Sequence, residues 1–232
     1  MARSGDETRK RILDAAERLF AERGFAGVTI RDITHAAKVD VALANYHFGP
    51  KEKLFEAVMM RRATLHMEER LARLERCIAD AGGAPTLEAV LHAYADAFLE
   101  RSLSGEEGWK HYFKLLAKLG LSPEWAPDLW SDYFDPFVKK LIEALRLALP
   151  GCPDDRLYWC YDFFSGILTH VFAETHRIDR LSGYLCRSDD LETAYPLMVS
   201  FVTAGCERIA RGERVPAEAV RPRRLRVSAT GE

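Results

Sequence analysis

Cysteine is scarce in this sequence and shows no paired arrangement. The 232 residues include only five cysteines, and no two of them form a Cys-x-x-Cys pair. An odd number of widely spaced cysteines is typical of reduced thiols in a cytoplasmic protein and argues against a disulfide framework. Without close pairs of Cys or His ligands, no metal site is expected. The cysteines are Cys77, Cys152, Cys160, Cys186 and Cys206.

Long apolar runs are also missing. No stretch approaches the roughly 18 consecutive apolar residues of a candidate membrane helix, so we expect no membrane span. The first seven residues carry charge with no apolar segment behind them, which argues against a secretory signal. Fifteen glycines and ten prolines are too few for a collagen-like or low-complexity chain. The composition therefore predicts a cytoplasmic globular protein.

Motifs of common catalytic sites are absent as well. No glycine-rich phosphate loop occurs in the sequence. The segment Phe164-Ser165-Gly166-Ile167 is not a nucleophile elbow, because Ser165 falls in the middle of an expected helix. We therefore expect neither an enzyme nor a bound cofactor.

The patterns that are present are helical. Alternating runs rich in Val, Ile and Thr, which would predict strands, are lacking. Apolar residues recur instead every three or four positions, and breaks rich in Gly and Pro separate the expected helices. The expected fold is all-α. Its parts are a helix-turn-helix domain at 1–50, a larger helical domain at 51–211 and a basic flexible tail at 212–232.

The first fifty residues predict three short helices with a tight turn between the second and the third. Thr29-Ile30-Arg31-Asp32 has the pattern of a capping box, which begins the second helix. The third helix covers about residues 41–47, and Gly49-Pro50 opens a longer helix. This arrangement is typical of a helix-turn-helix unit, which places one helix in the major groove of DNA.

The expected third helix is short and uncharged, and it ends in polar and aromatic residues. Asn45 can pair with adenine, and alanine methyl groups can contact thymine methyl groups. Tyr46 and His47 can donate to phosphates. Thr29 and Lys51 begin helices, whose N-termini favour phosphate. The predicted DNA-binding residues are Thr29, Arg31, Lys38, Val41, Ala42, Asn45, Tyr46, His47 and Lys51.

Charge is unevenly distributed although the net charge is only −2. Residues 1–62 carry 12 Lys or Arg against 9 Asp or Glu, and residues 63–210 carry 15 against 23. Residues 211–232 carry 6 against 3. A basic head on an acidic body fits a head that meets an anion such as DNA and a body that does not.

Three stretches of the head are similar to the TetR family of transcriptional regulators. They are Thr8–Phe25, Thr29–Ile33 and Tyr46–Leu54, and the similarity covers about the first 60 residues. The resemblance implies an all-helical homodimer with an N-terminal DNA-binding domain and a larger domain that binds a ligand and dimerises. The chain departs from the family pattern at Lys38, where Gly is usual, and at Asn45, where Tyr is frequent.

Aromatic residues are concentrated at 90–137, where Pro127 and Pro136 interrupt the expected helices. Such residues can form an ordinary core, or they can line a mostly apolar pocket with a few polar groups. The polar candidates for a pocket are His92, His111, Lys114 and His170. The predicted ligand-binding residues are Tyr94, Phe98, Trp109, Tyr112, Phe113, Leu116, Trp130, Phe134, Phe137, Trp159, Phe163 and His170.

The effector expected from this composition is a hydrophobic small molecule, with an anionic group as one option. The body also has a loose resemblance to the PsrA-type, fatty-acid-responsive members of the family, at 113–116 and 197–201. That resemblance implies a fatty acyl effector.

The last two expected helices, about 154–176 and 189–211, each carry a heptad-like apolar stripe. Such stripes form either internal core or a four-helix interface across a two-fold axis. In the resembled family the last two helices pair between subunits, and a dimer suits a protein that meets two half-sites. The predicted interface residues are Leu157, Phe164, Ile167, Val171, Tyr195, Met198, Val202, Gly205 and Ile209.

Together these patterns predict a ligand-controlled transcriptional regulator. We expect a repressor that binds a palindromic operator as a homodimer and is released by a hydrophobic small molecule. An alternative stays open, in which the chain is a helical ligand-binding or protein-interaction module whose head no longer binds DNA. Lys38, Asp40 and Ala44 favour this alternative. Lys38 changes the turn, Asp40 places negative charge near DNA, and Ala44 is smaller than the residue usual at its position.

Overall fold

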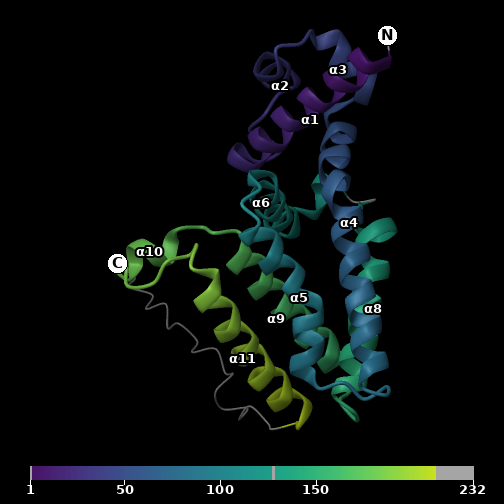
Figure 1. Cartoon of the computed structure of the whole chain (residues 1–232), viewed down its shortest axis with the longest axis vertical. Coiled ribbons are helices and arrows are strands. Elements are labelled where there is room, and N and C mark those ends of the chain that lie inside the picture. The colour runs from purple at the N-terminus through teal and green to yellow at the C-terminus, as the bar shows by residue number, and fades with distance from the viewer. Residues whose placement is uncertain (1, 127–128, 213–232) are drawn as a thin grey trace, which may run out of the picture.

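The structure, a computed structural model, describes residues 2–126 and 129–212. Three helices form a small head at one end of the molecule: α1 (Ala2–Arg23), α2 (Ile30–Ala37) and α3 (Val41–Phe48) (Figure 1). The long helix α4 (Lys51–Asp80) begins in the head and runs down one side of the body (Figure 1). The described residues contain helices and no strand, which confirms the predicted all-α class.

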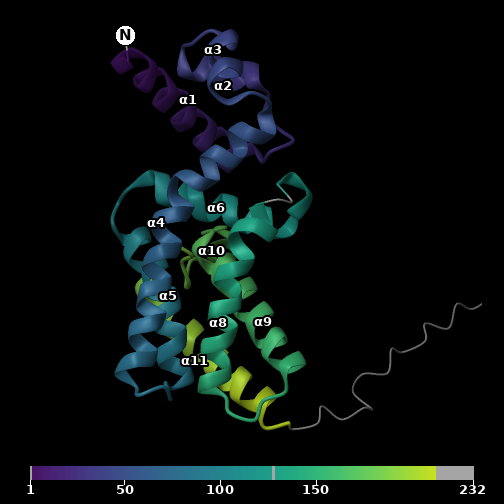
Figure 2. The ribbon, with the colours of Figure 1, turned by 90° about the vertical axis from the view of Figure 1, so that its right-hand side faces the viewer.

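The remaining helices build the body. α6 lies directly beneath the head, and α5, α8, α9 and α11 extend away from it (Figure 2). Over the described ranges, none of the helices is both long and apolar enough to cross a membrane. The predicted tail lies outside the described residues from position 213 onward. The body elements are α5 (Leu87–Leu103), α6 (Glu107–Leu121), η1 (Pro123–Trp125), η2 (Trp130–Phe134), α8 (Asp135–Ala148), α9 (Asp154–Phe172), α10 (Arg177–Leu181) and α11 (Leu191–Ala210).

The helix-turn-helix has the local contacts that its sequence predicts. The Thr29 side chain accepts from the Asp32 backbone N–H, and the Asp32 carboxylate accepts from the Thr29 N–H at 2.8 Å. These reciprocal bonds are a capping box, which begins α2. The turn after α2 is made by Lys38, which adopts a left-handed conformation with φ of 54°. Asp40 then caps α3 by accepting from the Ala42 N–H at 2.7 Å.

An aromatic cluster joins the head to the body. Phe20 of α1 meets Phe55 of α4 edge-on, with ring centroids 5.3 Å apart. Trp125 of η1 packs against Phe25 and Phe55 at 5.9 and 6.2 Å. Lys118 of α6 adds a hydrogen bond between head and body, since its ammonium donates to the carbonyl of Ala21 at 2.5 Å. The head therefore shares one continuous hydrophobic core with the body.

A buried carboxylate holds α1 against α4. Glu17 is 4% exposed and accepts from the Arg62 guanidinium at 2.6 Å and from Arg61 at 3.4 Å. Arg61 also pairs with Asp14 at 2.6 Å. Partial burial makes this pairing stronger than an ion pair in water, because the surrounding medium screens it less. The network fixes the angle at which α4 leaves the head.

We expect Glu17→Ala to lower the free energy of unfolding by about 2 kcal/mol, because two partly buried arginines each lose one carboxylate acceptor. Urea denaturation monitored by circular dichroism measures this change. Glu143→Ala is the matched control, because Glu143 pairs with Lys140 where both side chains are more than half exposed. Its effect should stay below about 1 kcal/mol. Equal losses in the two variants would contradict the structural role of Glu17.

Candidate DNA-binding surface and ligand cavity

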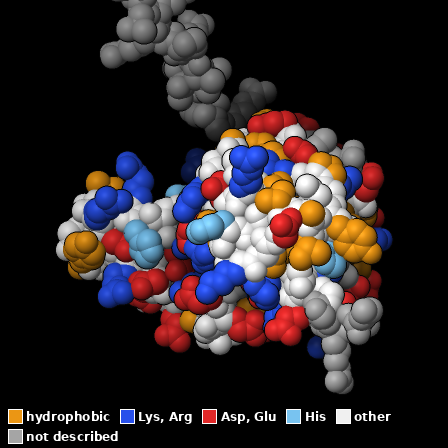
Figure 3. All heavy atoms as spheres, turned by 90° about the horizontal axis from the view of Figure 1, so that it is seen from above, with side chains coloured by type: hydrophobic (Ala, Val, Ile, Leu, Met, Phe, Trp, Pro, Cys, Tyr) orange, Lys and Arg blue, Asp and Glu red, His pale blue; other side chains and the backbone are white. Residues whose placement is uncertain are grey.

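The third helix of the head exposes most of its side chains. Only Ala44 of α3 is buried, while the Tyr46 side chain is 83% exposed. Ala42 and Asn45 are exposed as well, and Val41 is 37% exposed. Figure 3, which looks onto the head end, shows apolar, basic, acidic and histidine side chains on this side of the molecule. α3 therefore presents an accessible surface of mixed polar and apolar character.

The other predicted DNA-binding residues lie around this helix. Thr29 and Arg31 are exposed at the start of α2, Lys38 is exposed in the turn, and His47 is half-buried. Lys51 has a structural role that the sequence pattern did not indicate. Its ammonium donates to the carbonyls of Phe25 and Val28 at 3.0 and 3.1 Å and lies 4.1 Å from the centre of the Phe25 ring. Its predicted phosphate contact stays a prediction.

Arg11 of α1 fixes the turn between α2 and α3. Its guanidinium donates to the carbonyl of Lys38 at 2.7 Å and to that of Ala37. Charge-assisted bonds of this kind are stronger than neutral ones. Because the turn sets the position of α3, this contact helps to hold the exposed helix at a fixed angle on α1.

A cavity of about 1100 Å³ lies in the body beneath the head. Its walls come from α4, α5, α6, α8 and α9, and its upper end reaches Ala21 and Glu22 of α1. Exposed residues of α9, including Asp162 and His170, lie on its rim. The volume is slightly above the range of about 300–1,000 Å³ that is typical of small-molecule sites. The predicted residues that line it are Tyr94, Phe98, Leu116, Phe134, His170, His111 and Lys114.

Several other predicted ligand residues lie elsewhere. Trp109, Tyr112 and Phe113 surround the ring of His66 in the solid core, with ring centroids 5.4 to 5.9 Å from it. Phe137 stacks on Tyr133 at 6.4 Å and is not among the lining residues described. The prediction for Trp130 falls on a side chain outside the described residues.

Trp159 and Phe163 correct the ligand prediction most clearly. Their side chains are 57% and 50% exposed, and they stack on each other at 5.7 Å on the outer face of α9. His92, a polar candidate, also lies away from the cavity. It contacts Asp96 of α5 and the Tyr195 hydroxyl of α11, each at 3.1 Å.

The predicted dimer stripe is mostly internal. Leu157 and Phe164 of α9 are fully buried, and Tyr195, Met198 and Val202 of α11 are 3–5% exposed. These residues pack α9 and α11 against each other and against α5, so they are not free to face a partner. Ile167, Val171 and Ile209 are half-buried, and only Gly205 is exposed. The exposed apolar side chains on these helices are Tyr158, Trp159, Phe163, Leu197 and Phe201.

One buried charged residue of the cavity wall was not predicted from the sequence. Arg70 of α4 is 8% exposed and lines the cavity. It follows His66 by four positions on a buried stripe of α4, so an arginine within an apolar helical pattern was the available signal. Tyr161, Ser165 and Thr169 of α9 also line the cavity and were not predicted.

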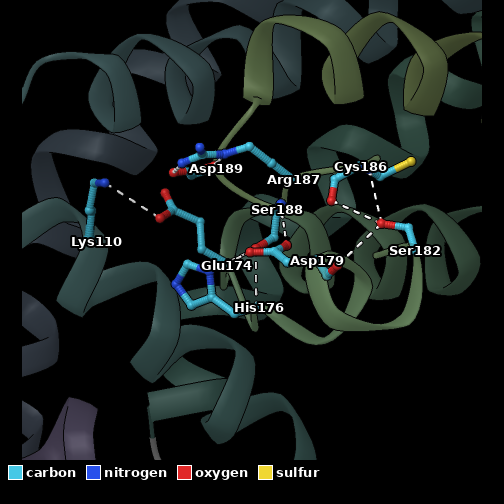
Figure 4. Close-up of polar contacts among 9 residues, drawn as sticks. All are labelled: Lys110, Glu174, His176, Asp179, Ser182, Cys186, Arg187, Ser188 and Asp189. Carbon is cyan, nitrogen blue, oxygen red and sulfur yellow. Dashed lines mark hydrogen bonds and ion pairs between the residues drawn. The ribbon is translucent and has the colours of Figure 1, made fainter. Parts of the chain in front are cut away.

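A cluster around α10 combines Ser, His and Asp in the manner of a hydrolase triad, but its geometry differs (Figure 4). The Asp179 carboxylate and the Ser188 hydroxyl both contact Nδ1 of His176, at 3.0 and 3.1 Å. A catalytic serine would contact Nε2, opposite the carboxylate. The bond to His176 lowers the pKa of Asp179 to about 2. Asp179 also accepts from the Ser188 backbone N–H at 2.7 Å, so the cluster closes the loop around α10.

No group of three or more potential metal ligands occurs among the residues that the structure describes.

Two domain models of one known family match the chain. Residues 12–58 match the bacterial regulatory proteins of the tetR family, and residues 92–205 match the tetracyclin repressor-like C-terminal domain.

The chain belongs to the TetR family. It is a transcriptional regulator with a DNA-binding helix-turn-helix and a C-terminal ligand-binding domain.

Curated relatives are regulators of the same kind. The HTH-type transcriptional repressor Rv3405c of Mycobacterium tuberculosis is 39% identical over 94 residues, which are 38% of this chain and 50% of that protein. The HTH-type transcriptional repressor NicS of Pseudomonas putida is 43% identical over 58 residues, which are 25% of this chain and 27% of that protein. The matched region thus spans half of these relatives' length or less.

Solved structures share the fold over most of the chain. SmeT, the repressor of the Stenotrophomonas maltophilia multidrug efflux pump SmeDEF, matches with a TM-score of 0.57 and 22% identity. That match covers 86% of this chain and 91% of SmeT. The hemolysin II transcriptional regulator HlyIIR matches with a TM-score of 0.56 and 18% identity, over 87% of this chain and 97% of HlyIIR. At these identities the likeness concerns the fold alone.

Replacing Lys38 by Gly should raise stability and weaken DNA binding together. Glycine adopts the left-handed conformation without steric cost, so we expect a gain of about 0.5–1 kcal/mol in unfolding free energy. Loss of one phosphate contact should reduce the slope of log K against log salt by about 0.9. Thermal denaturation and DNA binding at several salt concentrations measure the two effects.

Lys38→Ala is the control, because it removes the same charge and keeps the strained β-carbon. It should show the reduced salt slope without the gain in stability. An unchanged slope in both variants would place Lys38 away from the DNA backbone.

Proposed function

We propose that this regulator is a repressor that binds a near-palindromic operator as a homodimer and is released by a hydrophobic small molecule. The observation that carries the proposal is the exposed surface of α3, which begins at the Asp40 cap and follows a turn that Arg11 of α1 holds. A helix of this kind fits the major groove, where its first residues contact base edges. A repressor of this type acts in the cytoplasm.

Base reading is assigned to Asn45 and the neighbouring apolar groups of α3. An amide side chain can form two hydrogen bonds with adenine, and the methyl group of Ala42 can contact thymine. Tyr46 and Lys38 lie beside them and are exposed, so they can bind phosphates and fix the register. Asp40 is occupied as the cap of α3, which partly neutralises its charge through the helix N-terminus.

The second subunit is proposed to bind to the outer face of α9 and α11. This face exposes Trp159 and Phe163 on α9 and Leu197 and Phe201 on α11. Large apolar side chains gathered on adjacent helices favour an interface, and α9 packs directly on α11. A two-fold pairing there brings together two copies of the same surface and gives a dimer with two heads.

Release from DNA follows from where the cavity lies. Its wall includes α4, which continues into the head, and the end of α1, which belongs to the head. A ligand that fits the cavity better when α4 is displaced would shift the population toward that state. A hundredfold loss of operator affinity needs only about 2.7 kcal/mol of differential binding. A fatty acyl compound is one hydrophobic ligand that would fit.

Replacing Tyr46 by Phe should weaken binding to every operator sequence by about fivefold, because one phosphate hydrogen bond is lost. Asn45→Ala should instead change sequence preference, with a loss of about 1–3 kcal/mol of discrimination at one base pair. Gel shifts on the protein's own promoter and on single-base variants measure both effects.

Tyr184→Phe is the matched control, because Tyr184 is 70% exposed and lies in the loop after α10, outside the head. It should bind as the wild type does. If Tyr46→Phe and Asn45→Ala gave indistinguishable patterns across operators, the assigned roles would be wrong.

Replacing both Phe163 and Phe201 by Glu should produce monomers, with dimer affinity lowered at least about 100-fold by charge in an apolar interface. Sedimentation velocity measures the assembly state. Leu65→Glu is the control, because Leu65 is 54% exposed on α4, outside this face. A double variant that still sediments as a dimer would rule out the proposed interface.

A further inference from the structure

Arg70 is a buried cation that faces the cavity without an acidic partner. It is 8% exposed, and its Nε donates to the carbonyl of Tyr94 at 3.1 Å. Its guanidinium lies over the rings of Tyr94 and Phe98, at 3.6 and 4.6 Å from their centres. Among the described residues, no carboxylate lies within ion-pair distance of it. A buried charge without a counterion is costly, so this position calls for an anion.

Two carboxylates of this region, one next to Arg70 in the sequence and one in the cavity wall, are already paired with other cations. Glu69 precedes it on α4 and binds Arg73 at 2.7 Å and Arg101 at 2.8 Å. Glu174, which also lines the cavity, pairs with Lys110 at 3.4 Å. The protein thus leaves the guanidinium of Arg70 available to whatever occupies the cavity.

His66, one turn earlier on α4, does not compensate this charge. Burial, together with the charge of Arg70, holds the pKa of His66 well below its usual value, so its ring is neutral. Its two ring nitrogens and the hydroxyl of Tyr112 are buried without a hydrogen-bond partner. The positive charge of Arg70 therefore stands alone on this wall of the core.

The cavity wall combines apolar side chains with polar ones, among them His111 and Lys114. Phe98, Leu116 and Phe134 contribute apolar walls. Tyr161 lines the same cavity from α9, and burial raises its pKa to about 12, while the charge of Arg70 acts in the opposite direction. Its hydroxyl is therefore protonated at neutral pH and can donate to an anion.

We propose that the effector is an amphipathic organic carboxylate whose carboxylate pairs with the guanidinium of Arg70 and whose apolar part lies against Phe98, Leu116 and Phe134. The inference rests on the proposed function, because it names the ligand class of the same cavity. The planar guanidinium matches a carboxylate with two parallel hydrogen bonds, which a lysine cannot reproduce. Either an aliphatic or an aromatic group can supply the apolar part.

The position of Arg70 on α4 would link the ligand's carboxylate to DNA binding. Arg70 is on α4, the helix that carries the head, so the ligand's carboxylate contacts that helix directly. A neutral ligand of the same shape would fill the apolar part of the cavity without pairing with α4. We therefore expect the carboxylate to be required for release as well as for affinity.

Isothermal titration calorimetry on the full chain tests the proposal with two matched pairs of probes. Dodecanoate is compared with 1-dodecanol, and 2-naphthoate with 2-naphthalenemethanol. The wild type should bind at least one acid about 10- to 100-fold more tightly than its alcohol, as expected for a charge-assisted pair. Arg70→Met should lose this preference while its affinity for the alcohol stays within about twofold. The preferred pair shows whether the apolar part is aliphatic or aromatic.

Two further variants make the result specific. Arg76→Met removes an exposed charge from the same helix, and it should bind as the wild type does. Arg70→Lys keeps the charge without the planar fork, and it should give an intermediate preference. If Arg70→Met fails to fold by circular dichroism, the wild type and Arg70→Lys decide the outcome. Binding of neither acid, equal binding of acid and alcohol, or a preference retained without Arg70 would each overturn the proposal.

A gel shift without ligand separates this inference from the proposed function. A wild type that binds its promoter yet shows no carboxylate preference would support the proposed repressor function and contradict the proposed ligand class. A chain that prefers the acid through Arg70 yet binds no DNA would support the ligand class and contradict the proposed repressor function. With both intact, dodecanoate or 2-naphthoate should release the promoter fragment from the wild type but not from Arg70→Met.

Discussion

The continuity of α4 between the head and the body constrains every other feature of this molecule. At its start Lys51 holds two carbonyls of the loop after α1, and one turn later Phe55 packs into the aromatic cluster beneath the head. Arg62 then binds the buried carboxylate of Glu17. Arg70, two turns further on, forms part of the cavity wall. Because these contacts lie along one continuous helix, we expect a displacement of α4 at the cavity to reach the head.

The cavity combines two properties that suit it to the control of DNA binding by a ligand. It reaches the end of α1, so its contents are close to the head, and it contains a buried cation that the body does not neutralise. Packed interiors change between discrete arrangements because they deform little. An occupant that satisfies Arg70 in only one arrangement of α4 therefore has the differential affinity that a conformational shift requires. In the dimer proposed to form through the outer face of α9 and α11, this shift would change the distance and orientation between the two heads.

The sequence predicted the helices and caps of the head but not the packing of the body, for a physical reason. The head depends on contacts between neighbouring residues, such as the capping box of Thr29 and Asp32, and these are visible in sequence. The body depends on which side of a helix meets which neighbour. Leu157 and Phe164 share α9 with Trp159 and Phe163, and helical spacing alone does not distinguish the inner stripe from the outer one. The role of Arg70 required the fold, because its surroundings come from helices distant in sequence.

The most direct test of this account measures whether the cavity moves the heads. A spin label at Ala36→Cys, exposed on α2, with Cys186→Ser removing the exposed native thiol, allows the distance between the two heads of the proposed dimer to be measured by pulsed electron resonance. The account predicts that a saturating bound carboxylate shifts the distance distribution, and that the shift is absent in Arg70→Met. An identical distribution with and without the bound carboxylate would contradict the coupling through α4.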